Sequence, residues 1–487
     1  AWDFFVTDEF KMTSKLTLNV GMRYELHPSW SQADGKQSTF DVVSGKIVVP
    51  DGSLGAISPL MPQGYVDIVE ASSVKGFHSK NLIRNEYNNF APRIGLAWRP
   101  FDNRTVIRAG YGIFYDIVAR AVPVGGAPFV INEPTYTNTR PVPTVVLPRV
   151  FPASVAGPST ISIPQAINPG LRDPYSMQYN FTLEHERWDT GFRLSYVGTN
   201  TRQGEWGYNA NQPVPDGNLF ASKARPFQRY PGITYITNGA GHQYNSLTAE
   251  AERRFARGLA YQLSWVWARD IGDLERGESP ENAFDRAREK AVWLDIPTHR
   301  VTGNFLWELP FGKNGSRLHR AVLGGWELNA VYSFYSGQFL TPAWTGPDPV
   351  GTAFTGSNTP AQVTIRPNLL RDANLAVDSR TTRRWFDTAA FSAPAQGSYG
   401  TSSKGVILGP GSSILNAGVA KHFSIGERLR LRWELTATNA TNTPNYANPN
   451  TNITSVAQVG VITGVGGVSS LDSSGPRALR MGLRAEW

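Results

Sequence analysis

The feature that most constrains the fold of this chain is a strict alternation of apolar and polar residues over many segments. In the segment 15–26 the even positions are all apolar, and the odd positions are polar or glycine. The segments 326–336 and 428–437 follow a similar alternation. Because successive side chains of a β-strand point to opposite faces, each such segment predicts a strand with one apolar and one polar face.

Thirteen segments are predicted to be strands in this way, and a weaker candidate brings the number to about 14. They cover roughly 2–10, 15–27, 90–99, 104–116, 175–187, 191–200, 243–256, 258–269, 298–309, 324–338, 412–423, 427–439 and 476–487, with the weaker candidate at 40–49. Amphipathic helical periodicity is weak throughout, and only 280–294 suggests a short loop helix.

The connections between these strands alternate between short and long. Residues 101–103 and 188–190 are tight turns, whereas 117–174 and 339–411 are long segments rich in small and polar residues. Outer-membrane barrels have short periplasmic turns and long extracellular loops. Tryptophan and phenylalanine also gather near strand ends, as in the aromatic girdles of such barrels; examples are Trp2, Phe4, Trp98, Trp188, Trp206, Trp265, Trp267, Trp307 and Trp326.

We therefore predict an all-β fold, namely a transmembrane antiparallel outer-membrane β-barrel with long extracellular loops. The predicted strand length suits a tilted membrane wall, for which about 9–11 residues suffice. A secreted, carbohydrate-binding β-sandwich with an aromatic-rich core stays open as an alternative, although its loops would be of comparable length at both ends.

Composition excludes several other classes of protein. The chain has no cysteine, so disulfide scaffolds, thiolate zinc sites and cysteine nucleophiles are excluded. Its 14 Trp, 18 Tyr and 24 Phe argue against a disordered chain. The formal charge of +8 comes from dispersed basic residues rather than a basic cluster, so we expect no nucleic-acid partner.

The polar strand faces supply one set of candidate functional residues. They form a predicted luminal polar wall comprising Arg23, Glu25, Arg193, Arg428, Arg430, Arg432 and Glu434. Such a wall could hold a plug or guide an anionic solute. The simpler interpretation, which we favour, is a hydrated surface on which opposite charges pair across strands.

The loops supply a second set, Trp206, Tyr208, Asn209 and Tyr446. Aromatic rings stack on sugars or apolar ligands, and amides form hydrogen bonds with them, so these residues are candidate ligand contacts. Packing between loops is an equally good explanation for them.

Patterns typical of enzymes or metal sites are weak. Glu250 and Glu252 share a strand face, like the carboxylates of a glycosidase, but nothing else accompanies them and a hydrated wall explains them better. The acidic loop 269–295 fits no EF-hand spacing and also contains basic residues, so we expect a solvated loop. The seven histidines lack metal-ligand spacing. We predict no catalytic residue, no metal site and no cofactor, and we expect the protein not to be an enzyme.

Several segments resemble one known family. Residues 5–25 and 90–98 resemble hairpin segments of TonB-dependent outer-membrane receptors of the Oar-like type, which carry a carboxypeptidase-regulatory-like domain. Residues 384–391, followed by Gly-Pro-Gly at 409–411, are similar to a loop-to-strand segment of that group. Residues 477–487 resemble its last strand. In that resemblance the terminal Trp487 is the signal for barrel assembly, where phenylalanine is more common.

The resemblance implies a barrel of 22 strands around a plug. Residues 1–487 would then be the C-terminal part of the barrel, with the plug and the N-terminal strands not present in this sequence; a complete barrel of 14 strands is the less favoured alternative. The implied location is the outer membrane of a Gram-negative (diderm) bacterium, and the implied function is energised movement of a bulky solute.

The implied partners are outer-membrane lipid, the barrel-assembly machinery and a TonB-type energy-coupling complex acting through the missing plug region. A structural or adhesive surface barrel that binds a partner through its long loops is the alternative function.

Overall fold

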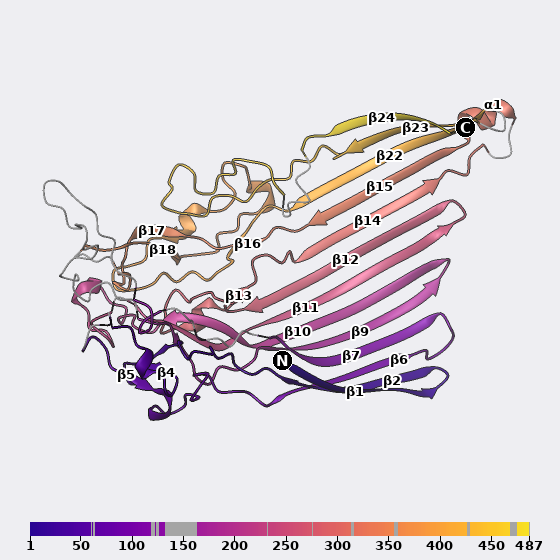
Figure 1. The fold of residues 1–487 in the computed structure, drawn as a ribbon. Helices are drawn as coiled ribbons and strands as arrows, with labels where there is room; N and C mark the ends of the chain where they lie inside the picture. Colours follow the sequence, from indigo (N-terminus) through magenta and orange to yellow (C-terminus); the bar gives the residue numbers. More distant parts are fainter. Residues whose placement is uncertain are drawn as a thin grey trace, which may run out of the picture.

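Thirteen long strands form one wall of tilted, antiparallel strands in the computed structural model (Figure 1). The structure describes residues 1–59, 61, 64–117, 122, 126–131, 163–230, 232–274, 276–312, 316–354, 359–425, 429–467 and 475–486. In spatial order the strands are β1 (Trp2–Thr13), β2 (Leu16–Leu26), β6 (Asn89–Trp98), β7 (Thr105–Tyr115), β9 (Tyr175–Arg187), β10 (Thr190–Asn209), β11 (Thr234–Ala256), β12 (Leu259–Gly272), β14 (His299–Glu308), β15 (Trp326–Tyr335), β22 (Ser412–Ile425), β23 (Leu429–Thr438) and β24 (Ala478–Glu486). Each pairs with the next, so the order in space is the order in the chain.

The predicted strands are confirmed in all thirteen strong segments. Two short strands, β8 (Ala166–Ile167) and β13 (Ala291–Val292), bring the sheet to fifteen strands. Because the long strands form one sheet rather than two packed sheets, the sandwich alternative was wrong. β10 and β11 run further than expected, through register shifts at Thr201 and Gly204. A bulge at these positions accommodates the irregularity without ending the strand.

The weak candidate at 40–49 is not a strand of the wall. It forms β3 (Thr39–Asp41) and β4 (Lys46–Val49), which join β5 (Ile68–Glu70) in a small sheet within a loop. Phe40, Ile47 and Val49 are fully buried there. These apolar side chains pack into a local loop core, so their alternation does not belong to a sheet face.

The two ends of the wall differ sharply (Figure 1). One end carries the tight turns and α1 (Arg317–Leu323), a helix that the sequence did not predict. Lys421 holds α1 against β22 by donating to the carbonyls of Val322 and Gly324, at 3.0 and 2.6 Å. No helix among the described residues has both the length and the apolarity needed to cross a membrane.

The other end carries the long loops. They contain three small antiparallel pairs: β16 (Phe339–Leu340) with β21 (Ile407–Leu408), β17 (Trp344–Pro347) with β18 (Gln362–Ile365), and β19 (Asn368–Leu369) with β20 (Phe391–Ser392). Short 3-10 segments complete them: η1 (Leu54–Ala56), η2 (Ala71–Ser73), η4 (Phe220–Ser222), η5 (Arg286–Glu289), η6 (Val377–Ser379) and η7 (Thr388–Ala390). The expected helix within 280–294 is therefore one 3-10 turn, η5.

One face of the wall is a continuous apolar surface. The strand register places Val20 beside Ile94, and Ile94 beside Tyr111. These side chains are exposed, and Phe4 and Met481 at the two edges are 65% and 75% exposed. Burying apolar surface gains about 25 cal/mol per Å². A continuous apolar face that extends from β1 to β24 therefore requires a medium that covers it. The buried cores lie in the loops instead, around Phe40, Leu82 and Phe386.

Candidate functional site

The opposite face of the wall carries the predicted polar residues, and opposite charges pair across its strands. Arg193 lies 3.2 Å from Glu184 on β9 and 3.0 Å from Glu250 on β11. Arg432 contacts Glu327 at 3.1 Å. Neighbouring strands are only about 5 Å apart, so the two pairs of Arg193 follow from the register, whereas Arg432 on β23 reaches across β22 to Glu327 on β15.

The remaining wall residues take several positions. Arg23 contacts Glu25 at 2.9 Å, and Glu434 lies 3.5 Å from Arg432. Arg430 is opposite Glu486 in the register, and Arg428 lies outside the described residues. The two carboxylates Glu250 and Glu252 lie on this same face. The face therefore supplies a hydrated, internally neutralised surface.

A buried extension of this network lies where β2 ends. His27 is sandwiched between Glu25 at 3.2 Å and Asp173 at 3.0 Å. Asn89, at the start of β6, donates to the same Asp173 oxygen at 2.6 Å. Asp3, Glu25 and His27 place their ligand atoms within 4.8 Å of one another, but the Arg23 guanidinium already bridges the two carboxylates. The group is therefore a structural tie between β2, β6 and the segment before β9.

The predicted loop contacts do not form one ligand site. Trp206 and Tyr208 stack at 5.1 Å between ring centroids, and Trp206 is 8% exposed because it packs on Ala240 and Leu274. Asn209 accepts hydrogen bonds from two backbone amides, which fixes the local turn. Tyr446 belongs to the loop after β23. Packing thus explains the first three residues.

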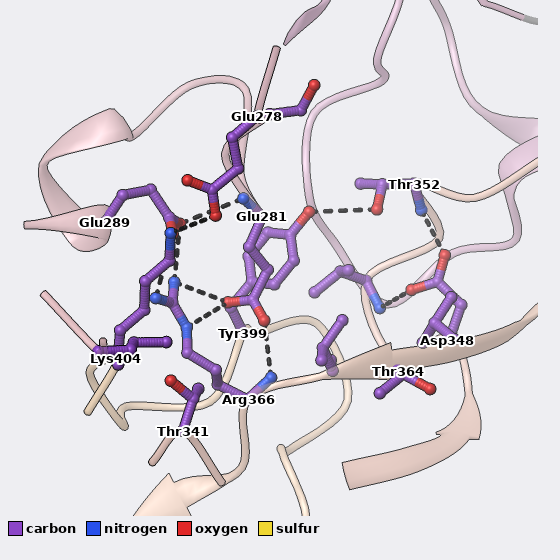
Figure 2. Close-up of a pocket in the computed structure, with 15 residues that line it drawn as sticks. Glu278, Glu281, Glu289, Thr341, Asp348, Thr352, Thr364, Arg366, Tyr399 and Lys404 are labelled. Carbon is purple, nitrogen blue, oxygen red and sulfur yellow. Dashed lines mark hydrogen bonds and ion pairs between the residues drawn. The ribbon is translucent and has the colours of Figure 1, made fainter. Parts of the chain in front are cut away.

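A cavity lies between two long loops, those following β12 and β15 (Figure 2). Its volume is about 620 Å³, within the range of about 300–1,000 Å³ that small-molecule sites occupy. Carboxylates, hydroxyls and aliphatic side chains share the lining. We call it the loop cavity, lined by Glu278, Ser279, Glu281, Glu289, Leu294, Thr341, Asp348, Val350, Thr352, Val363, Thr364, Ile365, Arg366, Tyr399 and Lys404.

A buried ion-pair network forms one wall of the loop cavity. Arg366, just after β18, is 5% exposed and donates to Glu281 at 3.1 Å and to Glu289 at 2.8 Å. Lys404 completes the network by contacting Glu278 at 2.6 Å and Glu289 at 3.2 Å (Figure 2). Glu289 is itself 2% exposed. Charges at such depth persist only when they are paired, so this network joins the two loops.

The opposite side of the loop cavity combines one carboxylate with backbone amides and hydroxyl groups. The Asp348 carboxylate accepts from the backbone amides of Val350, Thr352 and Ala353, at 2.9, 2.6 and 2.8 Å. The Tyr399 hydroxyl lies 3.1 Å from the Thr352 hydroxyl. Burial raises the pKa of Tyr399, so this phenol stays protonated at neutral pH. This side of the loop cavity therefore holds its polar groups in fixed positions.

Sequence reasoning missed this cavity for a physical reason. Its walls come from segments that are distant in the chain, and Arg366 lies 85 residues from Glu281. The acidic loop 269–295 was the one local signal, and its expected solvation is wrong for Glu289. The basic partners of Glu289 come from the other loop, as Arg366 and Lys404.

Comparisons with solved structures return receptors of bacterial outer membranes. The ferripyoverdine receptor of Pseudomonas aeruginosa, bound to ferripyoverdine, has 9% identity and a TM-score of 0.40, and the match covers 100% of this chain and 38% of the receptor. The siderophore receptor PiuA of Acinetobacter baumannii has 8% identity and a TM-score of 0.42, covering 99% of this chain and 42% of that one. The ferric-catecholate import receptor Fiu of E. coli K12 has 8% identity and a TM-score of 0.40, covering 99% and 44%.

The chain therefore spans less than half the length of these receptors. No curated protein sequence matches it significantly. The family described as "Outer membrane beta barrel domain" matches residues 1–480, which is almost the whole chain. This match explains the exposed apolar face, because outer-membrane lipid covers such a face in a barrel. The chain belongs to the family of outer membrane β-barrel domains.

Proposed function

We propose that this chain forms part of the wall and the extracellular loops of a TonB-dependent transporter, which moves a bulky solute across the outer membrane. Further strands beside β1 and β24 would close the wall, to 22 strands in total, around a plug. An inner-membrane complex of the TonB type would supply energy through that plug. The Oar-like subtype rests on the segments 5–25, 90–98 and 384–391.

The observation that carries this proposal is the loop cavity, positioned beyond the ends of a wall with one apolar and one polar face. The loop cavity combines carboxylates with hydroxyl and aliphatic groups, and buried ion pairs join its two sides. Because buried ion pairs contribute little net stability, we infer that the network holds the cavity in shape for a solute. The cavity would bind the solute before it enters the barrel.

The test is solute depletion by living cells. The host strain, a strain lacking the gene and the complemented strain would be grown on a defined mixture of solutes, and mass spectrometry would follow the medium. We expect at least one solute to be depleted only when the gene is present, and this difference to vanish with a protonophore. Identical depletion in all three strains would favour the structural or adhesive barrel instead.

We also propose that Trp487, which lies outside the described residues, is the signal read by the barrel-assembly machinery. An aromatic side chain at this position would dock during insertion, so the ring matters more than its identity. Trp487→Ala should lower the amount of heat-modifiable protein in the outer membrane, whereas Trp487→Phe should leave it unchanged. Equal assembly of all three forms would contradict this role.

A further inference from the structure

One smaller cavity adjoins the loop cavity, and a second meets that smaller cavity but shares no lining residue with the loop cavity. The first has a volume of about 100 Å³ and shares Glu278, Glu289, Leu294 and Lys404 with the loop cavity. The second, of about 390 Å³, lies at the loop ends of β10 and β11 and meets the first at Trp293. Trp293 stacks near His242, with 5.4 Å between ring centroids.

This set of cavities is acidic, although the chain as a whole carries a formal charge of +8. Eight carboxylates line the three cavities, against three cationic side chains. The carboxylates are Asp116, Glu205, Asp273, Glu278, Glu281, Glu289, Asp295 and Asp348, and the cations are Arg276, Arg366 and Lys404. Arg286 and Arg288 approach from behind the lining and reduce the imbalance without removing it.

The cations of the lining are already engaged by carboxylates. Arg366 and Lys404 are bound in the buried network, and Arg276 lies 3.9 Å from Glu205. An anionic solute would therefore find no unengaged cation along the described lining, and it would meet an excess of negative charge. A positively charged solute would instead gain favourable Coulomb energy, which is larger in a cavity than in bulk water.

We infer that the loop cavity binds a cationic organic solute that carries amino groups. Its ammonium groups would approach the carboxylates near Glu278, where the lining is open to solvent. Its hydrocarbon portion would contact the aliphatic side chains Leu294, Val363 and Ile365. The inference deepens the proposed function by naming the class of solute, but binding to the cavity does not require transport.

Calorimetric titration of the purified protein in detergent micelles tests this. The probes are spermidine as a polycation, maltotriose as a neutral polyol and citrate as a polyanion, each at low ionic strength. We expect spermidine to bind, to bind more tightly than the other two, and to weaken as salt screens the charges. Citrate or maltotriose binding as tightly as spermidine, or no spermidine binding at all, would overturn the inference.

Two variants connect binding to the loop cavity. Glu278→Gln removes one negative charge, and Ser279→Lys adds a positive charge at an exposed position without breaking an ion pair. Each should weaken spermidine binding by up to about five-fold, because single exposed charges contribute about 0.2–1 kcal/mol and about 1.4 kcal/mol corresponds to a factor of ten. Asp378→Asn, which alters an exposed carboxylate in η6 of the loop after β15 and outside the cavity lining, is the control and should change nothing.

Two measurements establish that each variant is folded: its β-strand content and the shift of its gel migration on heating. If Ser279→Lys is folded and binds spermidine as the parent does, the loop cavity is not the site. The titration also separates the two proposals. Spermidine binding without any gene-dependent depletion would contradict transport alone, whereas depletion of anionic solutes without spermidine binding would contradict only the cationic preference.

Discussion

Arg366 is the residue whose replacement should most disturb the loop cavity. Its guanidinium is buried and joins Glu281 to Glu289. Arg366→Met retains much of the side-chain volume, but it leaves Glu289, which is 2% exposed, with Lys404 as its one cationic contact among the described residues. Removing one partner of a buried ion pair costs about 3–5 kcal/mol, because the other charge remains buried.

The cost should fall on the loops and not on the wall, because the described partners of Arg366 all lie in the loop after β12. Hydrogen exchange resolves such local opening. Amides of 278–292 and 362–370 should exchange about 100-fold faster or more, since about 1.4 kcal/mol corresponds to a factor of ten. Amides of β9 and β10 should be unaffected.

Arg371 provides the matched control within the same loop. It pairs with Asp387 at 2.7 Å but is 56% exposed at its side chain. Exposed pairs contribute about 0.2–1 kcal/mol, so Arg371→Met should accelerate local exchange by less than about ten-fold. Adding Glu289→Gln to Arg366→Met should restore part of the protection. Equal, small effects of the two arginine substitutions would refute the reasoning from burial.

Three further predictions concern the wall and the loops. Leu435→Arg, on the apolar face near the middle of β23, should destabilise the protein in lipid vesicles by about 2–4 kcal/mol, and Thr436→Arg on the polar face by much less, as measured by urea unfolding. Hydrogen bonds from Arg371 hold the pKa of Asp387 below its ordinary value of 3.8, so the stability that this carboxylate contributes is present above pH 3.8 and is lost as the pH falls through the lowered pKa. Asp387→Asn should therefore loosen the loop to proteolysis at pH 7, and the difference from the parent should shrink as the pH falls through the lowered pKa. His27→Ala should leave two buried carboxylates without their bridging imidazole, lowering the free energy of unfolding by about 1–3 kcal/mol.

The wall could be predicted from sequence because its determinant is local. In 15–26 the alternation alone assigns each residue to a face, and the register confirms the assignment by placing Val20 beside Ile94. A one-residue slip would move every side chain to the wrong face. The strand bounds also show how far each residue lies from the end of its strand. Leu431 faces the apolar side but lies two residues from the start of β23, so Leu435 is the better test of the membrane centre.

The loops could not be predicted in the same way. Their apolar residues form separate cores, so the alternation at 40–49 marked a buried hairpin instead of a wall strand. Trp206 illustrates the same limit. An aromatic side chain near the end of a strand is equally typical of a ligand contact and of a membrane-interface girdle. Only the structure shows that Trp206 packs against Ala240 and Leu274. The ion-pair partners of Glu289, Arg366 and Lys404, lie in a different loop, so no local spacing in the sequence predicts them.

The wall and the loops are therefore stabilised in different ways. The wall is held by hydrogen bonds along neighbouring strands and by lipid against its apolar face, whereas the loops have their own buried clusters around Phe40 and Phe386. A substitution in the loop cavity can change recognition while the thirteen strands keep their register. This separation is the reason that charge changes at Glu278 and Ser279 should act on binding, and that opening after Arg366→Met should stop at the loops.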